Sequence, residues 1–149
     1  MNMCDCDSSF ENYLVTGANR GLGLGLVKEI LEQHKPTKVI ATVRNLDDCT
    51  ELKELKSKYK NLYIYKLDVI SVSDIENLIN ELQVLLKEEG LKYLINNAGY
   101  MSKGDQTKGI QHGIPPNIEQ ETNETFLRTY NINVVGPFML SKVCFHYRF

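Results

Sequence analysis

Short apolar runs alternate with longer amphipathic stretches along most of the chain. The short runs are rich in β-branched or aromatic side chains, which favours buried strands. The stretches between them carry apolar residues three or four positions apart, which favours helices with one buried face. The pattern predicts four strands, at residues 12–16, 38–43, 62–67 and 91–95. This alternation is typical of α/β proteins, in which a parallel sheet carries helices on both faces.

The amphipathic stretches also predict which residues of the helices are buried. In the helix that begins after Gly21, the spacing predicts one face that packs on the sheet, formed by Leu22, Leu26, Val27, Ile30 and Leu31. Two further helices are predicted over residues 47–60 and 74–89. Another is predicted to start near Asn123 and to run beyond Val134. Together these segments account for most of the chain.

Length and composition indicate one ordinary domain. A chain of 149 residues, 42% of them hydrophobic, can bury a real core. We expect residues 1–11 to be a disordered lead-in, residues 12–149 to form the domain, and residues 100–121 to form a long loop by the pocket mouth. The net charge of −2 gives no electrostatic reason to expect binding to nucleic acid or to an anionic membrane.

Targeting and cysteine patterns change this picture little. No apolar run has the length of a membrane span, and the N-terminus lacks the basic and apolar parts of a signal peptide, which favours a cytoplasmic location. The four cysteines do not have the spacing of a metal site. Cys4 and Cys6 alternate with two aspartates and could hold a metal, but a reduced, frayed tail is favoured.

The stretch from Tyr13 to Gly25 carries the clearest chemical signal. It reads Tyr-Leu-Val-Thr-Gly-Ala-Asn-Arg-Gly-Leu-Gly-Leu-Gly, so a strand ends in a glycine turn that leads into a helix. The amides and the dipole at a helix N-terminus favour a bound phosphate, and glycine lets the backbone approach it closely. The pattern predicts a dinucleotide site. The alternative is a turn that only packs the helix tightly on the sheet.

Three motifs resemble the short-chain dehydrogenase/reductase family, in particular its carbonyl-reductase branch with the sniffer-type reductases. They are Thr16-Gly17-x-x-x-Gly21-x-Gly23, Asn96-Asn97-Ala98-Gly99 and Asn133-Val134-Val135-Gly136. The resemblance implies a Rossmann-like sheet, here with strand order 3-2-1-4, and a nicotinamide dinucleotide at the carboxyl ends of the strands. It implies that the cofactor is bound by Gly17, Asn19, Arg20, Gly21, Leu22, Gly23, Arg44, Asp68, Val69, Asn97, Ala98 and Gly99.

Two arginines favour NADP(H) over NAD(H). Arg44 follows the second predicted strand and Arg20 lies in the glycine turn. In dinucleotide folds an acidic residue near the end of this strand binds the ribose hydroxyls, whereas an arginine accommodates a 2′-phosphate. The first carboxylates here are Asp47 and Asp48, which resemble helix-start residues. The alternative is that both arginines are solvated surface residues.

Two further roles follow from the resemblance. In the family, an Asp-Val pair at the end of the third strand contacts the adenine, which suggests this role for Asp68, although Asp68 could instead cap a turn. The family's helix asparagine, here Asn133, is a catalytic position that helps to hold a water through its backbone carbonyl. Pro137 has no N–H to donate to that carbonyl, which leaves it free for water. The alternative is a simple proline kink.

The resemblance covers about residues 10–144, roughly the first half of a family member. The family's catalytic serine and Tyr-x-x-x-Lys are absent from this sequence, and Asn133 alone of that set is present. We therefore expect the cofactor-binding part of an NADPH-dependent carbonyl reductase, inactive by itself. The full-length form would act on a small carbonyl compound and could be a homo-oligomer. The alternatives are a non-catalytic dinucleotide-binding remnant or an unstable truncated product, with an exposed edge at the fourth strand.

Overall fold

A four-stranded parallel sheet forms the centre of the computed structural model, which describes residues 10–34, 36–101 and 121–146. The strands are β1 (Asn12–Val15), β2 (Lys38–Val43), β3 (Leu62–Lys66) and β4 (Tyr93–Ile95). Their order in the sheet is β3-β2-β1-β4, and all three pairings are parallel. The predicted fold class and strand order are confirmed. The predicted lead-in, apart from residues 10 and 11, and most of the predicted 100–121 loop lie outside the described residues.

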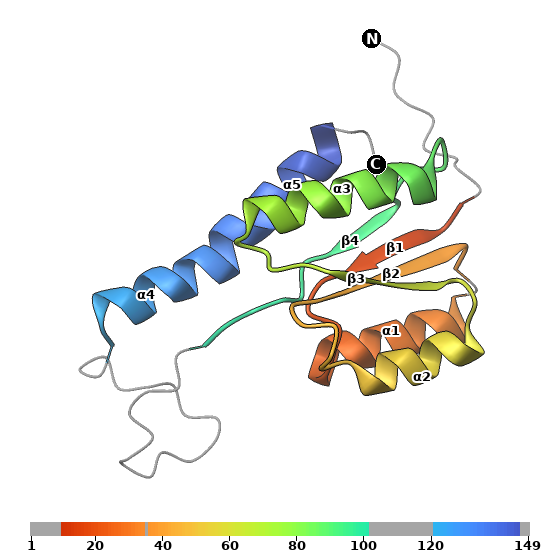
Figure 1. The fold of residues 1–149 in the computed structure, drawn as a ribbon, viewed down its shortest axis with the longest axis horizontal. Helices are drawn as coiled ribbons and strands as arrows, with labels where there is room; N and C mark the ends of the chain where they lie inside the picture. Colours follow the sequence, from red (N-terminus) through yellow and green to blue (C-terminus); the bar gives the residue numbers. More distant parts are fainter. Residues whose placement is uncertain (1–9, 35, 102–120, 147–149) are drawn as a thin grey trace.

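Helices cover both faces of this sheet (Figure 1). One face carries α1 (Gly21–Gln33) and α2 (Thr50–Lys58), and the other carries α3 (Val72–Leu86) and α5 (Gly136–His146). A shorter helix, α4 (Asn123–Tyr130), continues through a π-helical segment, η3 (Asn131–Val135), into α5. The predicted helix from Asn123 is therefore confirmed, with Thr122 as its cap: the Thr122 hydroxyl accepts from the Thr125 amide at 3.1 Å.

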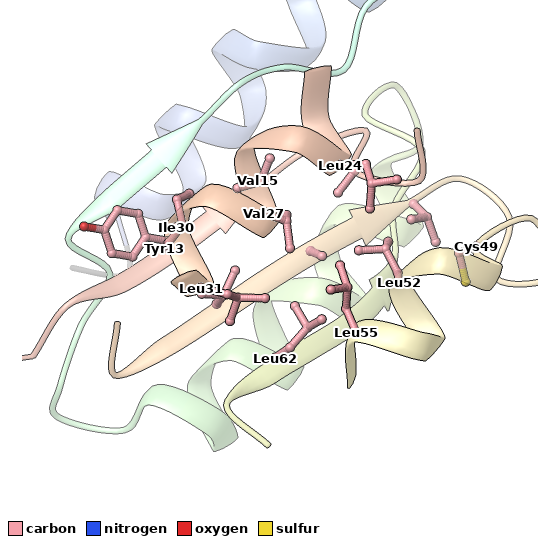
Figure 2. Close-up of a cluster of buried hydrophobic side chains, with 14 residues drawn as sticks. Tyr13, Val15, Leu24, Val27, Ile30, Leu31, Cys49, Leu52, Leu55 and Leu62 are labelled. Atoms are coloured by element: carbon pink, nitrogen blue, oxygen red, sulfur yellow. The ribbon is translucent and has the colours of Figure 1, made fainter. Parts of the chain in front are cut away.

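Two separate cores lie on the two faces because side chains alternate along each strand. In β1, Val15 faces the core beneath α1 and α2, whereas Leu14 faces the core beneath α3 and α5. Figure 2 shows the first core, in which side chains from α1 and α2 meet those of the strands. Both Leu14 and Val15 have no exposed surface. The central strand is therefore buried on both sides, as expected in a parallel sheet.

The buried face of α1 differs from the face that the sequence predicted. Leu22 is 82% exposed and Leu26 is 38% exposed, so neither packs on the sheet. The residues that do are Gly23, Leu24, Val27, Ile30 and Leu31. The helix is rotated in this way because Gly23 lies against the Gly17 carbonyl and the Asn97 side chain, which turns Leu22 outward.

The boundaries of α2 also differ from the prediction. The helix begins at Thr50 after an N-cap at Cys49, so Asp47 and Asp48 precede it. The Asp47 amide donates to the Asn45 side chain at 3.0 Å, and the Asp48 amide donates to the Asn45 carbonyl at 3.3 Å. These two bonds form a turn between β2 and α2. The aspartates are turn residues, and the sequence pattern alone could not separate that role from a helix start.

Among the residues that the structure describes, no helix is long and apolar enough to cross a membrane. Large apolar side chains are nevertheless exposed along α4, η3 and α5. They are Phe126, Leu127, Tyr130, Val134, Phe138 and Phe145.

Candidate cofactor-binding site

A cavity of about 390 Å³ opens at the carboxyl ends of the strands. The segments that follow all four strands contribute to its wall. It lies where the strand order reverses, between β1, which leads through α1 to β2 on one side, and β4, which is reached from β3 and pairs with β1 on the other side. This is the position at which open α/β sheets bind ligands. The lining residues are Gly17, Asn19, Arg20, Gly21, Arg44, Asn45, Asp48, Leu67, Asp68, Val69, Asn97, Ala98, Gly99, Tyr100 and Ile132.

The glycine turn after β1 is shaped by three different requirements. Gly17 has a φ of +65°, and a Cβ there would lie 2.8 Å from the Ala98 Cα. A Cβ on Gly23 would lie 2.5 Å from the Asn97 Nδ2 and still closer to the Gly17 carbonyl oxygen. Gly21 also has a positive φ, +57°, yet a Cβ there would meet nothing within 4 Å. Gly17 and Gly23 thus permit internal packing, whereas Gly21 borders open space.

The N-terminus of α1 can receive an anion. Its N-cap residue, Arg20, is extended and makes no side-chain cap bond, and the first turn contains no acidic residue. The first amides of a helix need an acceptor, and the helix dipole favours negative charge at this end. Together with the open space at Gly21, this arrangement fits a phosphate group. The residues present therefore suit a dinucleotide pyrophosphate.

Thr16 and Asn97 connect the end of β1 to the segment after β4. The buried Thr16 hydroxyl accepts from the amides of Asn97 at 3.0 Å and Ala98 at 2.9 Å. The Asn97 amide group donates to the carbonyls of Thr16 at 2.9 Å and Gly17 at 3.1 Å. These bonds fix the floor of the cavity, formed by Ala98 and Gly99, against the glycine turn.

Asp68 and Val69 form the wall that follows β3. The Asp68 Oδ1 accepts from the Ile70 amide at 3.2 Å, so Asp68 does have the turn role that the sequence left open. Its own amide donates to Asp74 Oδ2 at 2.9 Å, and this bond, with a lesser contribution from Lys66, lowers the pKa of Asp74 below 3.8. Gly136 packs closely here, since a Cβ on it would lie 2.8 Å from the Val69 Cγ2.

Asn133 does not line the cavity itself but holds a residue that does. Its Oδ1 accepts from the Tyr100 amide at 2.7 Å, and its Nδ2 donates to the Tyr100 carbonyl at 2.8 Å. The side chain thus fixes the segment after β4 while its backbone lies in η3. In η3 the Gly136 amide donates to the Asn131 carbonyl, an i→i+5 bond, just before Pro137. Such π-helical turns are frequent at functional sites.

Three charged side chains lie at the end of the cavity formed by the segments after β1 and β2. Arg20 and Arg44, both predicted, are joined there by Asp48, which the sequence analysis did not place in the site. Asn19 Nδ2 donates to Asp48 Oδ2 at 3.2 Å. This bond links the glycine turn to the turn before α2.

Ten of the twelve residues proposed to bind the cofactor line the cavity, whereas Leu22 and Gly23 do not. Leu22 points outward, and Gly23 is used in packing. The sequence analysis missed Asn45, Asp48, Leu67, Tyr100 and Ile132. Asn45 and Tyr100 directly follow predicted site residues, so proximity in sequence could have found them. In the described ranges, no three His, Cys, Asp or Glu residues are grouped to hold a metal, and Cys4 and Cys6 lie outside these ranges.

The sheet order and the cavity at its carboxyl ends define an α/β protein of the Rossmann type. The sequence profile of the short chain dehydrogenase family matches residues 11–148. The chain belongs to this family. It is 34% identical over 130 residues to the short chain dehydrogenase gsfK of Penicillium aethiopicum, covering 87% of this chain and 47% of that protein. It is 27% identical to an uncharacterized oxidoreductase of Schizosaccharomyces pombe, with 90% and 47% covered.

Solved structures agree with this assignment. The NADPH-bound carbonyl reductase from chicken fatty liver superimposes with a TM-score of 0.77 at 34% identity, covering 89% of this chain and 49% of that one. Carbonyl reductase Sniffer of D. melanogaster gives a TM-score of 0.79 at 32% identity, covering 91% and 51%. The resemblance to the carbonyl-reductase branch is therefore confirmed. The chain spans about half the length of the relatives and structures that it matches.

Proposed function

We propose that this chain is the cofactor-binding part of an NADP(H)-dependent oxidoreductase of the carbonyl-reductase type. The observation that carries the proposal is the corner at Gly21, where a left-handed glycine borders open space beside an uncapped helix N-terminus. A side chain there would occupy the volume that a pyrophosphate needs. The chicken carbonyl reductase, whose title names bound NADPH, supports the choice of cofactor.

Five further residues have proposed roles. Asp68 and Val69 would hold the adenine, and Ala98 and Gly99 would form the floor under the nicotinamide ribose, because both pairs line the cavity beyond the glycine turn. Asn133 would position a water through its backbone carbonyl, the role that the resemblance gives to this asparagine. The bound nicotinamide would supply hydride chemistry, and the protein would supply orientation and exclusion of water.

The preference for NADP(H) rests on Arg20 and Arg44. Both line the cavity and both are exposed to solvent, so their guanidinium groups are available to a 2′-phosphate. Replacing Arg44 with Asp should reduce the affinity for NADPH more than that for NADH. Equal losses for the two nucleotides would contradict this role.

Carbonyl reduction is proposed for a longer protein. The sequence contains no Tyr-x-x-x-Lys, and in the family these residues protonate the carbonyl oxygen and lower the tyrosine pKa. A second candidate is a non-catalytic dinucleotide-binding protein, which the open space at Gly21 and the uncapped N-terminus of α1 would suit equally well. Peptides from the source cells that extend beyond Cys144 and carry a Tyr-x-x-x-Lys would support the enzyme, and carbonyl reduction by these 149 residues alone would contradict both.

Thermal unfolding with NADPH tests the cofactor site directly. A ligand at one hundred times its Kd stabilises the folded state by about 2.7 kcal/mol, so saturating NADPH should raise the melting temperature by several degrees. Gly21→Val should abolish this rise by filling the open corner. Gly25→Ala is the matched control, because Gly25 lies one turn further along α1 and outside the cavity lining. An unchanged melting temperature of the wild-type chain with NADPH would refute the site.

A further inference from the structure

One residue of the cavity wall, Tyr100, has a cation above its ring. Tyr100 lines the cavity directly after the floor residue Gly99, and it packs against the core beneath α3 and α5. The guanidinium carbon of Arg128 lies 4.6 Å from the centre of the Tyr100 ring, within the range of a cation–π contact. Tyr100 is half-buried and Arg128 is exposed, so the contact lies at the surface beside the cavity.

The position of Arg128 is not explained by its own helix. A basic residue in the last turn of a helix often satisfies carbonyl groups that have no other donor. Arg128 is in the last turn of α4, but the chain continues through η3 into α5, so the helix has no open end there. Among the described residues, the salt bridges are all made by lysines. The Tyr100 ring is therefore the partner that the structure gives to this guanidinium.

The same continuous helix also holds the backbone of Tyr100. Asn133 Oδ1 accepts from the Tyr100 amide at 2.7 Å, and Asn133 Nδ2 donates to the Tyr100 carbonyl at 2.8 Å. Side chains five residues apart on an α-helix point about 140° away from each other. A π turn, closed by an i→i+5 bond, brings such residues closer to one face. Since η3 begins at Asn131, between Arg128 and Asn133, it allows both side chains to reach one residue.

We propose that Arg128 is a positioning residue that fixes the Tyr100 ring in the cavity wall, beside the nicotinamide end of the cofactor. The inference rests on the proposed function, because it concerns the same cofactor site, in which Ala98 and Gly99 underlie the nicotinamide ribose. The bonds from Asn133 restrain the backbone of Tyr100 but not its ring. The guanidinium selects one orientation of the ring, so the wall is formed before the cofactor binds and less conformational entropy is lost.

Two ligands distinguish this role from a general loss of positive charge. NADPH reaches both ends of the cavity, whereas adenosine 2′,5′-bisphosphate carries the adenosine and the 2′-phosphate without the nicotinamide nucleoside. Calorimetry on the full chain measures the Kd of each ligand. We expect Arg128→Gln to weaken NADPH binding by about two- to fivefold, which matches the strength of a cation–π contact at an exposed site, and to leave the Kd of the bisphosphate unchanged.

Three further variants test whether the ring is the partner. Arg128→Lys should restore most of the NADPH affinity, because lysine makes the same kind of contact elsewhere in this chain, with Lys56 Nζ 5.0 Å from the centre of the Tyr63 ring. Tyr100→Leu removes the ring, so adding Arg128→Gln to it should weaken NADPH binding no further. Lys142→Gln is the matched control, because it removes the same charge from an exposed position on α5 outside the cavity lining, and it should change neither Kd.

The outcomes distinguish this inference from the proposed function. If Arg128→Gln left the NADPH Kd unchanged while both ligands bound, Arg128 would not position the wall and the cofactor site would still stand. Equal weakening of the two ligands, or weaker NADPH binding in the Lys142 variant, would overturn the inference as well, because net charge would then be responsible. An undiminished effect in the Tyr100→Leu chain would show that Arg128 acts without the ring. If the wild-type chain binds neither ligand, the proposed function itself fails, and this inference fails with it.

Discussion

Gly23 and Gly25 lie two positions apart in the same helix, yet their surroundings are opposite. A Cβ at Gly23 would overlap the Gly17 carbonyl and the Asn97 side chain, whereas a Cβ at Gly25 would meet nothing within 4 Å. Glycine in a helix costs about 0.5–1 kcal/mol relative to alanine, so a helical glycine lowers stability unless a side chain at that position would clash. A side chain at Gly23 would clash, whereas one at Gly25 would not.

We therefore expect Gly25→Ala to stabilise the chain by about 0.5–1 kcal/mol and to raise its melting temperature by roughly 2–4 °C. Gly23→Ala should destabilise it, because the added methyl group must displace backbone atoms rather than a flexible side chain. Thermal unfolding followed by circular dichroism measures both. A stabilised Gly23→Ala would mean that the turn relaxes easily and that its close packing is not required.

Sequence motifs correctly predicted the cavity-lining residues that lie close together along the chain. Gly17, Arg20 and Gly21 were predicted because a single turn contains them. Leu22 was wrongly placed on the buried face because its outward direction depends on Gly23 packing against Asn97, a contact across 74 positions. Asp48 was missed for the same reason, since its partner Asn19 lies in another turn.

Between elements, Thr16 is the main connection of β1 to the segment after β4. Its hydroxyl accepts two backbone N–H bonds and is almost completely buried. Valine has a similar shape but no acceptor, so Thr16→Val would leave the Ala98 N–H without its partner, at about 1–3 kcal/mol. The Asn97 N–H would keep its other acceptor, the Ile95 carbonyl at 3.0 Å. We expect a loss of about 2 kcal/mol in chemical unfolding, and weaker binding of NADPH as Ala98 and Gly99 shift.

Thr16→Ser is the control for this prediction. Serine keeps the hydroxyl and removes one methyl group, so it should retain both N–H bonds and most of the binding. If the serine and valine variants lost equal stability, the methyl group rather than the hydroxyl would be the important part of Thr16.

The connection from β3 to α3 should make stability depend on pH. The pKa of Asp74 is lowered from 3.8, chiefly by the Asp68 amide and then by Lys66. A lowered folded-state pKa adds stability that is fully present above the unfolded value of 3.8 and is lost as the pH falls through the folded value. Asp74→Asn should therefore flatten the decline in unfolding free energy below about pH 4, as measured by urea titration at several pH values.

The remaining decline in the Asp74→Asn chain should come from Glu11 and Glu89. The pKa of each is also lowered, by hydrogen bonds from Lys92 to Glu11 and from Lys38 to Glu89. If the Asp74 variant had the same pH dependence as wild type, the carboxylate would not be linked to folding. At neutral pH the variant should lose the stability that the charged carboxylate adds, although the asparagine oxygen can still accept from the Asp68 amide.

Elements were predicted well where local signals determine them. The four strands and the long helices follow from apolar periodicity, and α4 begins one residue after its Thr122 cap. The π-helical segment η3 could not be predicted, although Pro137 indicated an irregularity. Its extra residue per turn accompanies the packing of Gly136 on Val69, a contact between distant segments that no local pattern encodes.

At the scale of the whole molecule, both cores depend on β1. This strand pairs with β2 on one side and β4 on the other, and its side chains reach both faces of the sheet. The strand order came from the family resemblance, because apolar runs show that strands exist but not which of them are neighbours. The cavity position then followed from the order, since it places the ends of β1 and β4 together.

If β1 couples the two cores, damage to one core must weaken the other. Leu14→Ala removes a fully buried side chain from the core beneath α3 and α5, which should cost about 2–5 kcal/mol. Leu52 and Leu55 of α2 belong to the opposite core and are not members of the cluster that contains Leu14. We nevertheless expect amide hydrogen exchange, followed by mass spectrometry, to accelerate in α2 as much as in α3, because global unfolding exposes both.

Val84→Ala is the control, because this side chain on α3 is 74% exposed. It should leave the exchange rates of both helices unchanged. Faster exchange confined to α3 would instead show that the two faces of the sheet open independently.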